Sequence, residues 1–176
     1  INLNYNYLLS NRQTNKQTTN YEMPIDVQPA FYKYGQLPAG TYYIGDLCYI
    51  FTDEEWDYHC KQLFTDGNKK VGIFHTRDNI PFANMSTKYG DGYYWGDVDD
   101  DTHYCVDSGT IGCFPLHSHR VYSSDSDERM LRVSVKTREK KARIETFDEP
   151  FNVYYNKESG NIVFDPIYIY TGTESD

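Results

Sequence analysis

Long apolar runs are missing from this sequence. No stretch approaches the roughly 18 consecutive apolar residues of a membrane-spanning helix, and no basic segment followed by an apolar one opens the chain as in a secretory signal peptide. We therefore expect neither a transmembrane segment nor a signal peptide. We also do not expect the protein to act on membranes.

Cysteine is also scarce. The 4 cysteines of this 176-residue chain form no C-x-x-C pair and are too few for a disulfide-stapled scaffold. They predict free, partly buried thiols, and they favour a reducing compartment or a virion as the location. A thiol nucleophile would need a histidine base beside it, and no local signature of a cysteine protease accompanies any of the four.

Positive charge is the third shortage. The chain carries 17 Lys and Arg against 26 Asp and Glu, a formal net charge of −9. Such an acidic surface repels phosphate backbones, so we expect no nucleic-acid partner. The charge is also split: residues 89–119 contain no Lys or Arg, whereas seven of the 17 lie within residues 129–143. This split predicts that an acidic face associates with a basic one. The predicted partner-binding residues of the basic part are Arg138, Lys140, Lys141 and Arg143.

Residues that favour β-strands are abundant. Aromatic residues make up 16% of the chain, including 18 Tyr. Short runs of strand formers between turn residues predict strands at 40–51, 71–75, 80–85, 93–95, 103–107, 112–116, 130–136, 143–147, 151–155, 161–164 and 167–170. The first of these is predicted to be broken or bulged at Gly45 and Asp46. The pattern predicts a mostly β domain of the α+β class, built as a bent antiparallel sheet or a sandwich.

One helix is predicted, at residues 53–64. Thr52 and Glu55 have the spacing of a capping box, which marks a helix start. An apolar stripe at helical spacing follows, and it consists of Trp56, Cys60, Leu63 and Phe64. The stripe predicts that this helix covers one face of the sheet.

Residues 1–37 differ in composition from the rest of the chain. Six of the first 20 residues are Asn, and the segment shows neither the strand nor the helix period. We predict an extended or disordered N-terminal arm at residues 1–37 and a single β-rich domain at 38–176. Scattered apolar residues are predicted to anchor the arm on a neighbouring protein. They are Tyr21, Ile25, Val27, Phe31 and Tyr34.

Two short motifs each place an aspartate close to glycine and cysteine. They are GDLCY at residues 45–49 and YCVDSGTIG at residues 104–112. In one interpretation, Asp46 and Asp107 accept hydrogen bonds from the backbone N–H groups of tight turns. In the alternative, the two carboxylates converge as the acid/base pair of a small hydrolase.

Together the two motifs resemble those of a family of uncharacterised small proteins of phages, bacteria and large DNA viruses. That family similarly has G-D-x-C-Y in an opening strand, a helix with Trp, and a later V-D-[SA]-G-x-I-G. The resemblance covers residues 37–115 and the β-rich tail but not the arm, and it implies a shared fold without an assigned activity. The triplet at residues 107–109, D-S-G, also resembles the active-site triplet of retroviral-type aspartic proteases, which needs a second such carboxylate. A tight turn is the alternative.

The acidic stretch at residues 97–101 offers oxygen ligands of the kind that Ca²⁺ prefers, from Asp97, Asp99 and Asp101. An EF-hand loop starting at Asp97 would need glycine and glutamate where the chain has Thr102 and Ser108. A looser calcium site is therefore the alternative to a solvated acidic loop, and no other cofactor is predicted.

These observations favour a non-enzymatic structural or interaction protein. Its most specific form is a virion-associated or minor capsid component that docks onto protein partners through its arm and its charge-split surface. No small-molecule substrate is indicated. The alternative is a small hydrolase that uses Asp46 and Asp107.

Overall fold

Alternating apolar residues build two antiparallel sheets that face each other. The computed structural model describes residues 24–25, 28–65, 67–69, 71–116 and 125–172. The six-stranded sheet contains, in spatial order, β1 (Phe31–Leu37), β11 (Phe151–Asn156), β12 (Ile162–Phe164), β13 (Ile167–Tyr170), β7 (Gly92–Gly96) and β8 (His103–Val106). The five-stranded sheet contains β10 (Arg143–Phe147), β2 (Gly40–Gly45), β9 (Thr110–Pro115), β6 (Pro81–Ser86) and β5 (Gly72–His75).

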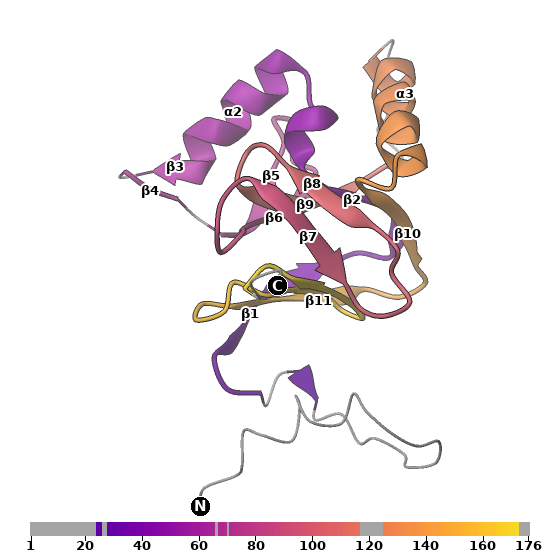
Figure 1. Ribbon diagram of the computed structural model, residues 1–176. Coiled ribbons are helices and arrows are strands. Elements are labelled where there is room, and N and C mark those ends of the chain that lie inside the picture. Colours follow the sequence, from indigo (N-terminus) through magenta and orange to yellow (C-terminus); the bar gives the residue numbers. More distant parts are fainter. Residues whose placement is uncertain (1–23, 26–27, 66, 70, 117–124, 173–176) are drawn as a thin grey trace, which may run out of the picture.

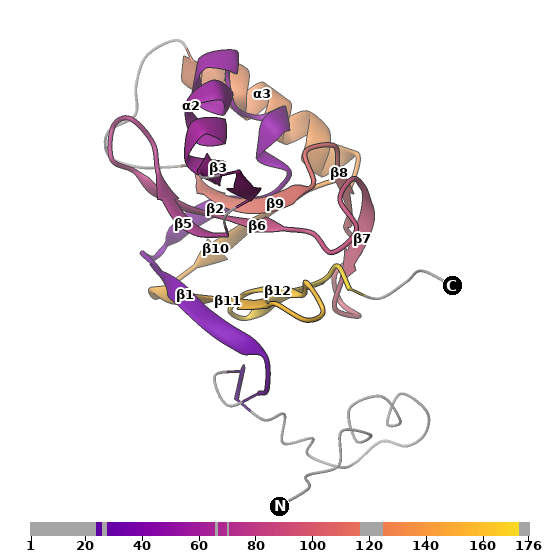
Figure 2. The same ribbon diagram turned by 90° about the vertical axis from the view of Figure 1, so that its left-hand side faces the viewer.

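Helices form a third layer on the outer side of the five-stranded sheet (Figures 1 and 2). They are the short 3-10 helix η2 (Leu47–Tyr49) and the α-helices α2 (Asp53–Leu63) and α3 (Asp125–Arg138). A small ribbon of β3 (Phe64–Thr65) and β4 (Asn68–Lys69) follows α2. The predicted fold class, a mostly β domain of the α+β class in sandwich form, is confirmed.

The two interfaces between the layers hold separate apolar clusters. Between the sheets, Tyr42 and Ile44 of β2 are buried in one cluster with Val153 of β11. On the opposite face of β2, Tyr43 is buried in the cluster under the helices, together with Val133 of α3. Because successive strand residues point to opposite faces, the buried run Tyr42–Ile44 of β2 serves both interfaces.

Helix α2 begins as predicted. The Thr52 hydroxyl accepts a hydrogen bond from the Glu55 N–H at 3.2 Å, and the Glu55 carboxylate accepts one from the Thr52 N–H at 2.9 Å. The predicted apolar stripe is only partly buried: Leu63 is buried, but Phe64 lies beyond the helix with 53% of its surface exposed. The buried polar residue of the helix is His59, which the stripe did not include.

The prediction of a single helix is wrong, because residues 130–136, predicted as a strand, belong to α3. Their sequence fits both periods, since Met130 and Val133 are three residues apart. The structure buries Val133 completely and leaves Leu131 63% exposed. Residues two apart would share a face in a strand, so this difference is that of a helix. Tertiary contacts favour it: Arg129 and Arg132 donate to the backbone carbonyls of Ile50 and Phe51, at 3.3 and 3.0 Å.

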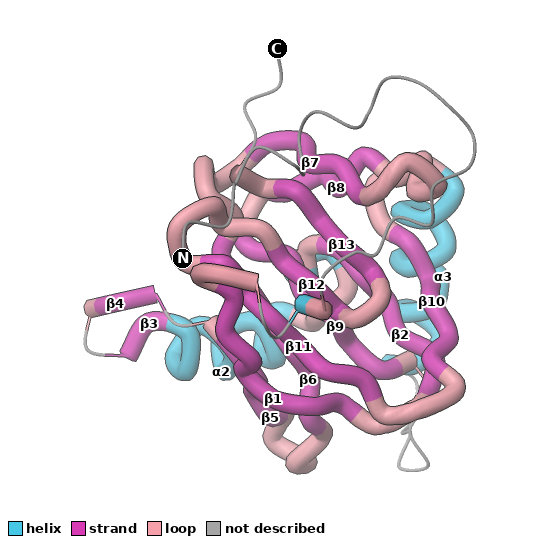
Figure 3. Tube along the Cα trace, turned by 90° about the horizontal axis from the view of Figure 1, so that it is seen from below, coloured by secondary structure: helices cyan, strands magenta, loops and turns pink. Residues whose placement is uncertain are grey.

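The first described strand lies within the segment predicted as an arm. β1 pairs antiparallel with β11 and forms one edge of the six-stranded sheet, as Figure 3 shows from below. Leu37, at its end, is completely buried. The predicted boundary between residues 37 and 38 therefore falls after the first strand of the sheet. Residues 1–23 lie outside the described part of the chain.

Candidate functional site

The two aspartate motifs meet in space. β2 pairs with β9 so that Gly45 lies opposite Gly112, and this register brings Asp46 beside the turn between β8 and β9. One carboxylate oxygen of Asp46 accepts from the backbone N–H groups of Asp107 and Ser108, both at 2.8 Å. The other accepts from the Ser108 hydroxyl at 2.7 Å and from the Cys48 N–H at 3.0 Å. We call this group the Asp46 clasp.

Glycine is required at the centre of the clasp. A Cβ atom built on Gly112 would lie 2.5 Å from two side-chain carbons of Leu47 and 2.9 Å from the Ala83 carbonyl oxygen. A Cβ atom on Gly45 would lie 2.7 Å from the Cβ of Ala142. Carbon atoms in contact are normally about 3.5–4.0 Å apart, so the motif glycines allow the strands and η2 to approach closely.

The hydrogen bonds of the clasp hold its turn and η2 in place. Asp46 is completely buried, and both of its oxygens are engaged by donors. The carboxylate of Asp107 is exposed and accepts from the Tyr49 hydroxyl, so the link from Asp107 to Asp46 runs through the Asp107 backbone N–H. This arrangement satisfies the amides of a tight turn, as predicted for Asp46. Asp107 does not play the matching role.

The thiols near the clasp are not arranged as nucleophiles. None of the four cysteines, all of which the structure describes, forms a disulfide bond. Burial, together with the neighbouring carboxylate of Asp46, raises the pKa of the Cys48 thiol well above its usual range, which disfavours the reactive thiolate. The Cys105 sulfur lies 3.3 Å from the Tyr49 hydroxyl, and the Lys136 ammonium lies 3.8 Å from the centre of the Tyr49 ring. These contacts fix η2 against β8 and α3.

The acidic and basic parts of the chain pair with each other. The Arg143 guanidinium lies 3.2 Å from the Asp100 carboxylate, and Lys140 forms an ion pair with Asp101. Burial by itself would raise the pKa of Asp100, but hydrogen bonds from Tyr104 and Thr102 lower this pKa below its usual value. Two other predicted partner-binding residues lie nearby: Lys141 is 3.3 Å from Glu139, and Arg138 is exposed in the last turn of α3. Part of the predicted charge complementarity is thus used within the chain.

The aspartates proposed for calcium have separate partners. Asp97 accepts a hydrogen bond from the Tyr170 hydroxyl at 2.8 Å, Asp101 pairs with Lys140, and Asp99 is exposed. Among the residues that the structure describes, no three His, Cys, Asp or Glu side chains are grouped so that they could hold a metal ion.

The predicted anchors of the arm divide into two groups. Tyr21 and Val27 lie outside the described residues, and Ile25 is half-buried. Phe31 and Tyr34 belong to β1 and contact the domain itself: Phe31 packs edge-on against Tyr168 at 5.9 Å between ring centres, and Tyr34 against Tyr155 at 6.2 Å.

The outer face of the six-stranded sheet carries aromatic side chains that the sequence analysis did not single out. Trp95 of β7 lies opposite Tyr170 of β13 on one side and opposite His103 of β8 on the other, so the three share one face. Tyr93 precedes Trp95 by two residues and Tyr168 precedes Tyr170 by two, so both join that face. We call these five residues the aromatic face. The alternation within GYYWG, where Tyr94 is buried and its neighbours are exposed, was the available signal.

Contacts within the aromatic face hold its rings in place. The rings of Tyr168 and Tyr170 lie 4.5 Å apart and those of Trp95 and His103 lie 5.6 Å apart, centre to centre. Tyr93 and Trp95 nevertheless remain 55% and 38% exposed. The preceding and following loops add the exposed carboxylates of Asp91, Asp97 and Asp99. The result is an aromatic surface next to negative charge.

Comparison of the chain with protein-family models, with curated proteins and with solved structures found no match. The resemblance of the two motifs to the phage, bacterial and large-DNA-virus proteins therefore stays a prediction. Within the described residues, every helix is too short or too polar to cross a membrane.

Proposed function

We propose that this chain is a non-enzymatic interaction protein that binds a cationic segment of a protein partner on its aromatic face. The observation that carries this proposal is the exposure of Tyr93 and Trp95 on the side of β7 turned away from the core. Tyr and Trp are enriched among the residues that contribute most to binding at protein interfaces, because they bury a large rigid surface. A sheet face that keeps such rings in water suits a docking surface.

Charge determines the kind of partner. The net charge of −9 and the carboxylates of Asp91, Asp97 and Asp99 attract basic segments. The faces of Tyr and Trp rings also attract Lys and Arg side chains, by about 0.5–1 kcal/mol at exposed sites. Nearby basic residues of the chain already pair with its own carboxylates: Lys140 with Asp101, Arg143 with Asp100 and Lys141 with Glu139.

A virion-associated or minor capsid component is the more specific form of this proposal. The Asn- and Tyr-rich composition and the resemblance of the two motifs support it. The arm, as predicted, would add a second contact in such an assembly. The hydrolase alternative receives no support from the clasp, in which Asp46 is completely buried and engaged by four donors.

The test is binding of a fluorescent peptide of alternating Arg and Gly, measured by anisotropy at low and at physiological salt. We expect binding that weakens with salt, and a loss of about tenfold or more in affinity in Trp95→Ala, as for a residue central to an interface. The same peptide with Glu in place of Arg should not bind.

Tyr32→Ala is the matched control, because Tyr32 is 54% exposed, much like Tyr93, but lies on β1 at the other edge of the same sheet. It should bind the Arg peptide as the parent does, whereas Tyr93→Ala should bind more weakly. Equal affinities of the parent and Trp95→Ala would contradict the proposal, as would equal losses in the two tyrosine variants.

A further inference from the structure

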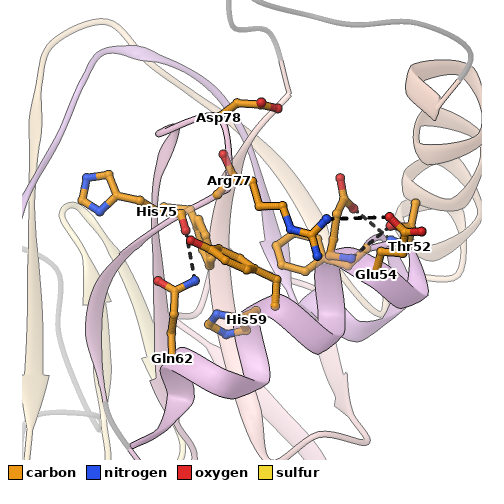
Figure 4. Close-up of a pocket in the computed structure, with 12 residues that line it drawn as sticks. Thr52, Glu54, His59, Gln62, His75, Arg77 and Asp78 are labelled. Atoms are coloured by element: carbon orange, nitrogen blue, oxygen red, sulfur yellow. Dashed lines mark hydrogen bonds and ion pairs between the residues drawn. The ribbon is translucent and has the colours of Figure 1, made fainter.

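A second candidate site lies on the helix side of the domain, formed by elements other than the aromatic face. A cavity of about 140 Å³ opens between α2 and the β5–β6 hairpin. Its inner wall includes Phe51, Phe82 and His59, and its outer part includes the exposed Arg77 and Asp78 of the hairpin turn. Figure 4 shows His59 on the helix side and Arg77 and Asp78 on the opposite loop.

His59 is the unusual member of this wall. It is 1% exposed, and its ring is held by aromatic contacts with Phe74 at 4.9 Å and Phe82 at 5.1 Å. Burial lowers its pKa to about 4, so the imidazole is neutral near pH 7. One ring nitrogen, Nε2, lies 2.7 Å from the side-chain nitrogen of Asn84. The other, Nδ1, is buried and has no hydrogen-bond partner within the described residues.

A chain of buried polar side chains connects His59 to the Asp46 clasp. The Asn84 side-chain nitrogen also lies 3.2 Å from the Thr110 hydroxyl. That hydroxyl lies 2.7 Å from the hydroxyl of Ser108, which in turn lies 2.7 Å from Asp46. All five residues except Ser108 are almost completely buried. The chain runs from the clasp along the helix-facing side of the five-stranded sheet to the wall of the cavity.

The carboxylate of Asp46 sets the direction of every hydrogen bond in this chain. An ionised carboxylate only accepts hydrogen bonds, so the Ser108 hydroxyl must donate its one proton to Asp46. Ser108 then accepts from the Thr110 hydroxyl, and Thr110 accepts from the amide N–H₂ of Asn84. The second N–H of Asn84 points at Nε2 of His59, which therefore accepts. A neutral imidazole carries one proton, so it sits on Nδ1.

This assignment leaves a defined donor without a partner. The Nδ1–H of His59 is buried, and an unmade hydrogen bond at a buried donor is costly. Asn84, whose side-chain oxygen is also unpartnered in the described residues, does not line the cavity, whereas His59 does. His59 thus contributes to the cavity wall, and its Nδ1–H is a buried donor without a partner in the described part of the chain.

We propose that this cavity binds a small neutral molecule with one six-membered ring and a hydrogen-bond acceptor, which receives the proton of His59 Nδ1. The size fits one ring, since an engineered cavity of about 150 Å³ in another protein holds benzene. Glu54 and Asp78 at the opening outnumber Arg77, which lies 3.8 Å from Glu54, so the opening disfavours anions. The inner wall of Phe51, Phe82 and His59 holds no carboxylate to pair with a desolvated cation. The proposal does not depend on the function proposed for the aromatic face.

Benzamide and benzamidine test this inference, because they have nearly the same shape. Benzamide is neutral and offers a carbonyl acceptor, whereas benzamidine is a cation whose amidinium group only donates. Nitrogen-15 NMR of the histidine side chains should show His59 with its proton on Nδ1. We expect benzamide at millimolar concentration to shift the Nδ1 signal and benzamidine to leave it unchanged.

Thr110→Val interrupts the chain while leaving the cavity wall intact. Asn84 can then turn its oxygen to His59, which moves the proton to Nε2 and removes the donor. We expect at least a fivefold loss of benzamide affinity. Thr171→Val is the control, since Thr171 is also completely buried and also donates a hydrogen bond, to the Gly160 carbonyl, in another part of the fold. It should bind benzamide as the parent does.

The remaining outcomes each overturn the inference. They are a proton on Nε2 of His59 in the parent protein, failure of benzamide to bind, binding of benzamidine as tight as that of benzamide, and equal benzamide affinity in Thr110→Val and the parent. If Thr110→Val does not fold, the tautomer and the comparison of the two probes on the parent protein decide the question alone.

Discussion

Ser108 donates two hydrogen bonds to Asp46, one from its backbone N–H at 2.8 Å and one from its hydroxyl at 2.7 Å, although the two residues are 62 positions apart in the sequence. This pair joins the two aspartate motifs into one buried unit. It closes the turn between β8, in the six-stranded sheet, and β9, in the five-stranded sheet. Asp46 therefore stabilises the connection between the two sheets of the sandwich.

Replacement of Asp46 by Asn should destabilise the fold. An amide has one acceptor oxygen where the carboxylate has two, so at least one of the three backbone N–H groups bound by Asp46 loses its partner, at a cost of about 1–3 kcal/mol. Chemical denaturation of the variant measures the loss directly. Asp99→Asn is the control, because Asp99 is exposed and the expected change lies within about 0.5 kcal/mol. A melting temperature of Asp46→Asn at or above that of the parent would show that the carboxylate is strained.

Stability should fall in mild acid because of His59. Its pKa is about 4 in the folded protein and 6.5 ordinarily, so the unfolded chain binds a proton more readily across that interval. The free energy of unfolding therefore rises with pH between these values, and acidification from neutral pH to pH 4 should remove about 3 kcal/mol of it through this residue.

Urea denaturation at the two pH values measures this effect. His59→Gln, which cannot titrate, should lose correspondingly less stability on acidification than the parent. His75→Gln, at the exposed rim of the cavity, is the matched control for the replacement of a histidine by glutamine. An identical acid response of the parent and His59→Gln would rule out His59 as the cause.

Gly112→Ala should destabilise the packing of η2 on β9. The new methyl group would lie 2.5 Å from Leu47, and such overpacking costs about 1–3 kcal/mol. Leu47→Ala removes the atoms in conflict, so the double variant should be more stable than the sum of the single effects predicts, by about 1 kcal/mol. Additive losses in this double-mutant cycle would place the strain elsewhere, at the Ala83 carbonyl.

Two truncations separate the arm from the sheet. Removal of residues 1–30 keeps β1, so we expect a melting temperature close to that of the parent. We also expect loss of the protein complexes that the arm is predicted to form, measured by gel filtration. Removal of residues 1–37 deletes an edge strand that pairs with β11 and buries Leu37. Loss of that side chain alone costs about 1.5–3 kcal/mol, so the longer truncation should melt well below the shorter one. Equal melting temperatures would contradict the role of β1.

Local patterns in the sequence predicted most of the elements. The runs of strand formers at residues 71–75 and 80–85 predicted two strands, and the structure places them at 72–75 and 81–86, paired as the β5–β6 hairpin. The capping box of Thr52 and Glu55 predicted the start of α2, since both hydrogen bonds join residues three apart. The strands on either side of the acidic loop were predicted in the same way, and β7 and β8 pair there.

Contacts between distant segments decided the rest. Residues 130–136 fit a strand and a helix equally well. Burial of Val133, together with the hydrogen bonds from Arg129 and Arg132 to the carbonyls of Ile50 and Phe51, selected the helix. Nothing local distinguishes Asp46 from Asp107, yet the register of β2 on β9 buries the first and leaves the second exposed. The sequence did not single out His59 for the same reason, because its partner Asn84 is 25 residues away. The direction of their hydrogen bond depends on a third segment of the chain, which contributes the carboxylate of Asp46.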